Sequence, residues 1–412
     1  MTVAQQSPPK RASMTWGKQA AFIAISNVFA LLMLACLGEI ALRLLPLGKY
    51  RSAPFRQYDP VIGISLIPNM HVNHARGCFQ GEVSTNRWGM RDRDRTLEKP
   101  PGDFRIAMIG DSVVEAVHVK PDQVVNIRTE ERLRQLGYSN VEVMNFAVEG
   151  IGTTQELLLY KEKVRQFHPD LVLLMFTATN DILNNSSTLQ PKIYGIHHWF
   201  APYYDLAPDG KLVFTPVEPR HLNRLRSYFE RHSVLVYYLE RVWLKVNLFP
   251  YKWQGLPIDF ETYEDDPMDN ELKQAWQVTG KVLTIMNDTV NADGSKFLVL
   301  VWPLPYDIDP DWRQRMMKQY GTVPASFNPF RSAERLQAIA DSNHIPMEFL
   351  APYAQAYRDQ RHLQWPYFSL PCDTHLNALG HEESAEAITE ILEKRNLLPA
   401  QTQQSTKSNL VN

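Results

Sequence analysis

Hydrophobic residues are concentrated most strongly near the N-terminus of this chain. The 19 consecutive positions from Ala20 to Gly38 include only two clearly polar side chains. A helix of this length is about 28 Å long, close to the thickness of the hydrocarbon core of a bilayer. The pattern predicts a transmembrane anchor over residues 18–46, preceded by a polar, disordered arm over residues 1–17.

Two other interpretations of the apolar segment were compared with the anchor. A cleaved signal peptide has a shorter apolar core and a small-x-small cleavage site, which this segment lacks. Lipoprotein processing would use Leu34-Ala35-Cys36, but Met33 fits that pattern poorly and the apolar run continues past the cysteine. Three Lys or Arg residues flank the segment on each side, so charge does not fix its orientation. A large domain after an N-terminal anchor is most simply exported, which predicts a periplasmic or extracellular location.

Residues 50–103 alternate short apolar stretches with turn-forming residues. No helical periodicity is maintained in this region, and Pro100-Pro101-Gly102 ends it. Short apolar stretches bounded by glycine, proline and asparagine are typical of strands joined by tight turns. The pattern predicts a small β-rich lead-in packed against the domain that follows.

Residues 104–397 alternate near-continuous apolar stretches with segments of helical periodicity. The predicted strands are 104–109, 141–147, 170–177, 296–302 and 345–349, and the predicted helices lie near 122–136, 154–167, 271–290, 331–342 and 379–395. Thr153 and Glu156 have the spacing of a capping box at the start of the second helix. Buried strands alternating with helices are typical of a parallel sheet covered on both faces. We therefore expect a flavodoxin-like, three-layer α/β/α fold with a five-stranded parallel sheet.

A long insertion, residues 184–270, separates the third and fourth predicted strands. Asp209-Gly210 predicts a hairpin, and the periodicity near 220–246 predicts a helical segment. Such insertions either shape the crevice of the sheet as a lid or extend its core. Residues 398–412 are polar and are expected to be a disordered tail.

Composition and charge exclude several classes of function. The 412 residues are 44% hydrophobic and 21% charged, as expected for a folded globular domain. The chain has 43 Lys and Arg residues and 45 Asp and Glu residues, so it has no overall positive charge that would attract nucleic acid. His197-His198 has no carboxylate or cysteine at ligand spacing, and no Walker loop or complete dinucleotide motif is present. We expect no metal site, no cofactor and no nucleic-acid partner.

Four polar motifs fall at, or just beyond, the carboxyl ends of predicted strands. They are Gly110-Asp111-Ser112, Gly150-Ile151-Gly152, Asn180-Asp181 and Asp373-Thr374-His375. Each motif alone is an ordinary turn or helix start. The carboxyl ends of neighbouring parallel strands meet in one crevice, however, so the four motifs are expected to form one site.

The order of these motifs resembles that of the SGNH/GDSL hydrolase superfamily, over roughly residues 104–395. The resemblance implies that Ser112 is a nucleophile activated by His375, with Asp373 orienting the imidazole. It also implies an oxyanion hole formed by the backbone N–H groups of Ser112 and Gly150 and the side chain of Asn180. Together with the anchor and the lead-in, the chain is similar to membrane-anchored bacterial members linked to surface polysaccharides.

The chain departs from the commonest family pattern at the catalytic acid. Asp-x-x-His would place the aspartate at position 372, which is Cys372, whereas this chain has Asp-x-His. Residues two apart in an extended segment point to opposite sides, so Asp373 must be turned toward His375 to reach it. The Asp-x-His spacing also occurs in polysaccharide O-acetyltransferase relatives. Cys78 and Cys372 either pair, which would tie the lead-in to this loop, or remain free thiols.

Three functions remain compatible with these residues. The first is a serine esterase that removes O-acyl groups, most simply O-acetyl, from a glycan or another ester through an acyl-enzyme. The second is a polysaccharide O-acetyltransferase, which passes the same acyl group to a sugar hydroxyl. The third is a non-catalytic scaffold within a surface-polymer assembly system. The triad alone does not distinguish water from a sugar as acceptor.

Overall fold

The structure is a computed structural model of the full chain. It describes residues 15–45, 55–76, 79–194, 201–217, 225, 228–229, 232–239, 242–243, 246, 270–303, 305–311, 314, 328, 330–363, 367–370 and 375–401. The predicted arm at 1–14, the tail from 402 onward, Cys78, Cys372 and Asp373 lie outside these ranges.

Five parallel strands form the central sheet. They are β5 (Phe104–Gly110), β6 (Val141–Asn145), β7 (Leu171–Phe176), β10 (Lys296–Val301) and β11 (Met347–Phe349), in the spatial order β11-β10-β7-β5-β6. Numbered along the chain, this is the 2-1-3-4-5 order of a flavodoxin-like sheet. All six residues of β7 are buried, because this central strand is covered on both faces. The predicted five-stranded parallel sheet is confirmed.

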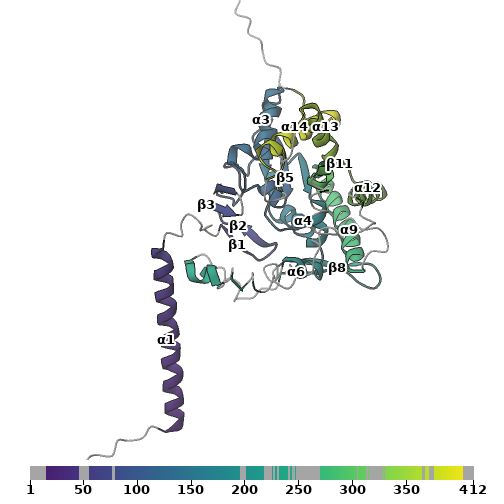
Figure 1. Ribbon diagram of the computed structural model, residues 1–412. Coiled ribbons are helices and arrows are strands. Elements are labelled where there is room, and N and C mark those ends of the chain that lie inside the picture. Colours follow the sequence, from purple (N-terminus) through teal and green to yellow (C-terminus); the bar gives the residue numbers. More distant parts are fainter. Residues whose placement is uncertain are drawn as a thin grey trace, which may run out of the picture.

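Helices cover both faces of the sheet and separate two hydrophobic cores. Ala107 and Ile109 of β5 belong to one core and Ile106 and Met108 to the other, as alternation along a strand requires. The first core contains residues of α4 (Thr153–Glu162), α9 (Asn270–Ala292) and α12 (Arg331–Asn343), and the second those of α3 (Val125–Gln135), α13 (Ala351–Gln360) and α14 (Ala378–Lys394). Short helical elements are α2 (Ser112–Glu115), η2 (Pro121–Gln123), η3 (Val164–Phe167), α5 (Ala178–Asn184), α6 (Leu189–Tyr194) and α10 (Pro305–Ile308). The three layers are visible in Figure 1.

The lead-in consists of two antiparallel hairpins. Strands β1 (Arg56–Asp59) and β2 (Gly63–Leu66) form the first, and β3 (His71–Arg76) and β4 (Phe79–Ser84) form the second. Phe79 and Val83 of the second hairpin pack with Val117, which follows α2, in a small hydrophobic cluster. The predicted β-rich lead-in is therefore present, and it packs directly beside the start of the main domain.

The insertion contains, after α6, the hairpin that Asp209-Gly210 predicts. Strands β8 (Tyr203–Leu206) and β9 (Leu212–Thr215) pair across this turn. Tyr204, Leu206 and Leu212 pack against the first hydrophobic core. The hairpin therefore extends the core, which is one of the two roles predicted for the insertion.

Helix α1 (Trp16–Leu44) extends away from the domain and contacts it near its C-terminal end, where Glu39 and Arg43 bond to residues 232–235 (Figure 1). None of its residues is buried, and its most apolar window has a mean hydropathy of 2.4. By length and composition it is able to cross a membrane, and these properties are shared by membrane spans and by signal sequences.

Candidate functional site

Ser112 lies where β5 turns into α2. Gly110 ends the strand where neighbouring atoms leave little room for a side chain. An added Cβ would lie 3.0 Å from Val114 Cγ2 and 3.2 Å from the Met175 carbonyl oxygen. Asp111 caps the short helix by accepting the Val113 N–H at 3.0 Å. Ser112 is thus the first residue of the helix and is only 7% exposed, so its hydroxyl is held at the carboxyl edge of the sheet.

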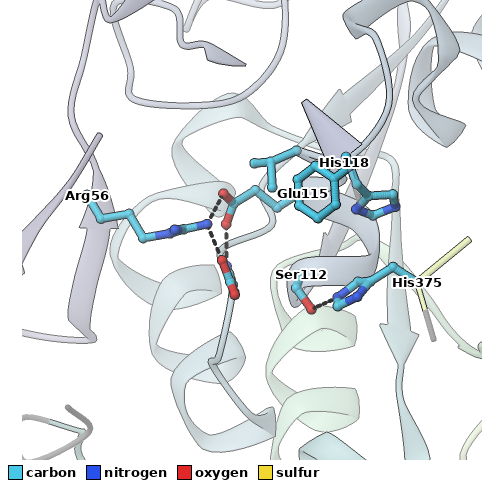
Figure 2. A pocket seen from close by; sticks show the side chains of 8 residues that line it. Arg56, Ser112, Glu115, His118 and His375 are labelled. Carbon is cyan, nitrogen blue, oxygen red and sulfur yellow. Dashed lines mark hydrogen bonds and ion pairs between the residues drawn. The ribbon is translucent and has the colours of Figure 1, made fainter. Parts of the chain in front are cut away.

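His375 reaches Ser112 from the other end of the chain. Its Nε2 atom is 2.8 Å from Ser112 Oγ, although 263 positions separate the two residues (Figure 2). The backbone of this segment is fixed on both sides, because the His375 carbonyl accepts the Leu370 N–H at 2.9 Å and Asn377 caps α14. A hydroxyl hydrogen-bonded to an imidazole is the arrangement in which the imidazole can remove the hydroxyl proton. The structure therefore brings together the predicted nucleophile and base.

Asp111 connects the start of α2 to the end of β7. Its carboxylate accepts a hydrogen bond from Asn180 Nδ2 at 2.7 Å and one from Thr177 Oγ1 at 3.3 Å. Burial raises the pKa of Asp111, and these hydrogen bonds oppose that rise by stabilising the charged form. Asn180 is thus bonded to the residue next to Ser112, an aspartate that sequence reasoning treated only as part of a turn, and its role as an oxyanion donor is still a prediction.

The loop that contains Gly150 is held by three charged side chains. Gly150 has a φ of +79°, a conformation that favours glycine. Arg56 Nη2 lies 2.5 Å from Glu115 Oε1 and 2.5 Å from Glu149 Oε2 (Figure 2). The other Glu115 oxygen accepts the backbone N–H of Glu149. Glu115 is fully buried, and burial raises its pKa whereas Arg56 lowers it. The loop therefore depends on a residue of the lead-in.

A small pocket opens at Ser112 and His375. Its empty volume is about 240 Å³, including open solvent, and it is lined by Arg56, Phe79, Ser112, Glu115, Val117, His118, Glu149 and His375. Arg56 and Phe79 come from β1 and β4, so the lead-in forms part of the wall. Sequence reasoning did not find this contribution, because no local signal links strands 56–59 and 79–84 to the end of β5.

Two further histidines, His118 and His381, lie close to His375 and to each other. The His118 ring centroid is 5.0 Å from that of His375, and His118 Nε2 is 3.4 Å from His381 Nε2. Burial lowers the pKa of His118 well below its ordinary value and that of His381 to about 3, with nearby Arg91 adding to both effects. Both rings are therefore neutral at neutral pH, so no second imidazolium opposes a positive charge on His375.

No protein-family model and no curated protein matches this sequence. Similar solved structures include a GDSL-like lipase from Bacteroides thetaiotaomicron, with 13% identity, 72% of this chain and 92% of that chain covered, and a TM-score of 0.34. A lipase/acylhydrolase from Enterococcus faecalis has 13% identity, 73% and 99% coverage and a TM-score of 0.35. An acetylxylan esterase from Geobacillus stearothermophilus, solved as a catalytic mutant, has 12% identity, 71% and 95% coverage and a TM-score of 0.35.

Two predicted features of the site lie outside the described residues. Asp373, the predicted orienting acid, and the pairing of Cys78 with Cys372 are therefore still predictions. Within the described ranges, no three His, Cys, Asp or Glu residues are grouped so that they could hold a metal ion.

The predicted capping box at Thr153 is wrong. Gly152 is the N-cap of α4, and the Gln155 side chain accepts the Gly152 N–H at 3.3 Å. Glu156 is instead fully buried, and neither of its carboxyl oxygens has a hydrogen-bond partner among the residues that the structure describes. An added Cβ at Gly152 would lie 2.7 Å from Asn184 Cβ, so the close approach of α5 accounts for glycine at this cap.

We expect Glu156→Gln to stabilise the protein at alkaline pH. Burial, with Asp181 and Asp111 nearby, raises the pKa of Glu156 well above its ordinary value. The folded state therefore keeps a proton that the unfolded chain releases above about pH 4, and stability falls as the pH rises toward the folded pKa. Glutamine is neutral at every pH, so the gain should be about 1–3 kcal/mol at pH 8 and near zero at pH 4.

Urea unfolding of both proteins at the two pH values checks this expectation. Glu162→Gln, which changes an exposed carboxylate on the same helix, is the matched control. An equal gain for Glu156→Gln at both pH values would contradict a titrating origin.

Proposed function

We propose that this protein is a serine esterase that removes short O-acyl groups, most simply O-acetyl groups, from a glycan. The observation that carries the proposal is the 2.8 Å hydrogen bond between Ser112 Oγ and His375 Nε2 inside a small pocket. A serine hydroxyl is a weak nucleophile unless an adjacent base removes its proton. The fold, the pocket and this pair of side chains together support acyl chemistry on Ser112.

In the proposed reaction, Ser112 Oγ attacks the acyl carbon while His375 takes the hydroxyl proton. The C–O bond to the sugar then breaks, and His375 gives the proton to the departing sugar oxygen. Water attacks the resulting acyl-enzyme, again with His375 as base, and releases the free acid. The tetrahedral intermediates would be stabilised by the N–H groups of Ser112 and Gly150 and by the Asn180 amide, and Asp373 would orient the imidazole.

The walls of the pocket support a short acyl group. The apolar wall is formed by Phe79 and Val117, which are 8% and 5% exposed and leave little room beside Ser112. The lining also includes the charged side chains of Arg56 and Glu149. A long acyl chain would have to displace Phe79 or lie against these charges, whereas an acetyl group would not.

The proposed location follows from helix α1. We propose that α1 anchors the chain in a membrane and that the catalytic domain lies on the side facing away from the cytoplasm. A glycan substrate outside the cell, such as a surface polysaccharide, would be accessible to such a domain.

Acyl-chain selectivity and the fate of the acyl group test the proposal together. The full chain in detergent should hydrolyse p-nitrophenyl acetate at least about 10-fold faster than the octanoate, and a fluorophosphonate should label Ser112 in a peptide map. An acetylated oligosaccharide supplied with an unacetylated one should yield mainly free acetate. Transfer to the second oligosaccharide in excess of free acetate would make the protein an O-acetyltransferase, whereas the absence of both labelling and turnover would favour the scaffold.

A further inference from the structure

The insertion carries an apolar stripe on a helical segment that the proposed reaction does not use. All described residues between 225 and 246 are helical except Ser233. Seven large apolar or aromatic side chains on this segment are between 41% and 66% exposed: Leu225, Tyr228, Phe229, Leu239, Val242, Trp243 and Val246. Within each half their spacing is three and four residues, so each group follows one face of a helix.

The same segment is basic, unlike the chain as a whole. Residues 225–246 contain four Arg or Lys side chains and two Glu side chains, whereas the full chain has a formal net charge of −2. Helices with an apolar face and an excess of basic residues are typical of membrane surfaces, where they meet anionic headgroups. Charge and pattern thus point to the same kind of partner.

A carboxylate of helix α1 caps the second half of this segment. Glu39 Oε2 accepts the Leu235 N–H at 2.9 Å and the Ser233 hydroxyl at 2.8 Å, and Glu39 Oε1 accepts the Val234 N–H at 3.1 Å. These amides belong to the first turn of a helix, which has no internal acceptors for them. A carboxylate at that position is favoured both by hydrogen bonding and by the helix dipole.

Arg43 completes the contact between the two helices. Its Nε atom donates to Glu39 Oε1 at 2.6 Å, and its Nη2 atom donates to the His232 carbonyl at 2.7 Å. Figure 1 shows the described part of the segment, in teal, beside the end of α1 that leads into the domain. The segment is therefore joined to α1 at a defined position along its length.

That position fixes the depth of the segment. Glu39 is the first charged residue after the apolar run that ends at Gly38. If α1 spans the bilayer, a charge at this point lies at the level of the headgroups rather than in the hydrocarbon. A helix whose first turn is bonded to Glu39 lies at the same level, where tryptophan and tyrosine are also favoured.

We propose that the helical residues described between 225 and 246, in two halves that meet at Ser233, lie on the membrane as an interfacial helical segment, with their apolar side chains in contact with acyl chains. The inference rests on α1 as the membrane span and does not depend on the proposed esterase activity. The catalytic domain would then be held to the bilayer at two adjacent points, the span and the interfacial helix. Such an arrangement limits rotation of the domain about the anchor and fixes the distance of the Ser112 pocket from the membrane.

Photolabelling of the full chain from within the bilayer tests the proposal. We would use nanodiscs, one chain per disc, containing phosphatidylglycerol with a diazirine in its acyl chain, and map the lipid adducts by mass spectrometry. We expect adducts on peptides from α1 and from 225–246, and at least about 10-fold fewer on the 203–215 hairpin, where Val213 and Phe214 are also exposed. Adducts on α1 alone would overturn the interfacial helix but keep the anchor, and adducts on neither would overturn both.

A second measurement keeps the outcome independent of labelling efficiency. Glu39→Ala should raise the hydrogen-exchange rates of the Val234 and Leu235 amides at least about 10-fold and reduce the adducts on 225–246. Glu390→Ala, which breaks another i,i+4 ion pair, with Lys394 on α14, should change neither. Unchanged exchange in Glu39→Ala would overturn the docking to α1. Loss of adducts only when two chains share a disc would assign the stripe to a second copy.

Discussion

Replacing either Ser112 or His375 by alanine should lower kcat/KM for p-nitrophenyl acetate by at least about 10³-fold. In the proposed reaction each residue supplies one half of the same proton transfer, so loss of either would remove the activated nucleophile. For the same reason, the double variant should be little worse than either single variant. Steady-state kinetics with matched circular dichroism spectra would measure both effects.

The lead-in offers an unusually close control for this experiment. His71 Nδ1 lies 2.8 Å from Ser84 Oγ across the β3–β4 hairpin, which is the same separation as in the Ser112–His375 pair. His71 is exposed and lies outside the lining of the pocket. Ser84→Ala and His71→Ala should therefore leave the activity within about 2-fold of the unmodified protein. A comparable loss in these variants would mean that the assay reports folding rather than chemistry.

The sheet could be predicted because it follows from local pattern, and the Ser112–His375 pair because the order of four local motifs resembles that of a known superfamily. Each of the five strands is a short apolar run, and each predicted boundary lies within two residues of the observed one. Ser112 was located by the rule that strand ends share a crevice, which needs no knowledge of side-chain packing. Helix α13 was missed because only Ala354 and Tyr357 of its ten residues are buried, a pattern too sparse to indicate a helix.

The rest of the site depends on contacts between segments that are distant in the sequence. Glu115, His118 and Glu149 carry no local signal, since their roles come from Arg56, His381 and the pocket that they share with Ser112. At Glu156 a local motif was misleading: the spacing from Thr153 predicted a capping box, but the whole Glu156 side chain is buried instead. Local motifs predict where the chain turns, whereas the charge pairs of this site are set by how the lead-in packs.

That dependence gives the second large effect: Arg56→Gln should lower kcat by about 10- to 100-fold and change KM by less than about 3-fold. Without the guanidinium, the carboxylates of Glu115 and Glu149 lose the countercharge that they share. Their repulsion should displace the loop that carries Gly150, and losing a single oxyanion donor typically costs about 10²- to 10³-fold in rate. Removing one partner of a buried ion pair also costs stability, here about 3–5 kcal/mol.

Two further variants separate positioning of the loop from a general loss of stability. Arg87→Gln, also in the lead-in, breaks an exposed pair whose atoms are 4.0 Å apart, and it should leave kcat and stability nearly unchanged. Adding Glu149→Gln to Arg56→Gln removes one of the two opposed charges and should recover part of kcat. If Arg56→Gln unfolded more easily but kept its full kcat at a temperature where it is folded, Arg56 would serve the fold and not the loop. A rise in KM with kcat unchanged would instead place Arg56 in contact with the substrate. A fall in kcat that Glu149→Gln partly reverses is expected only if the lead-in sets the geometry of the proposed oxyanion hole.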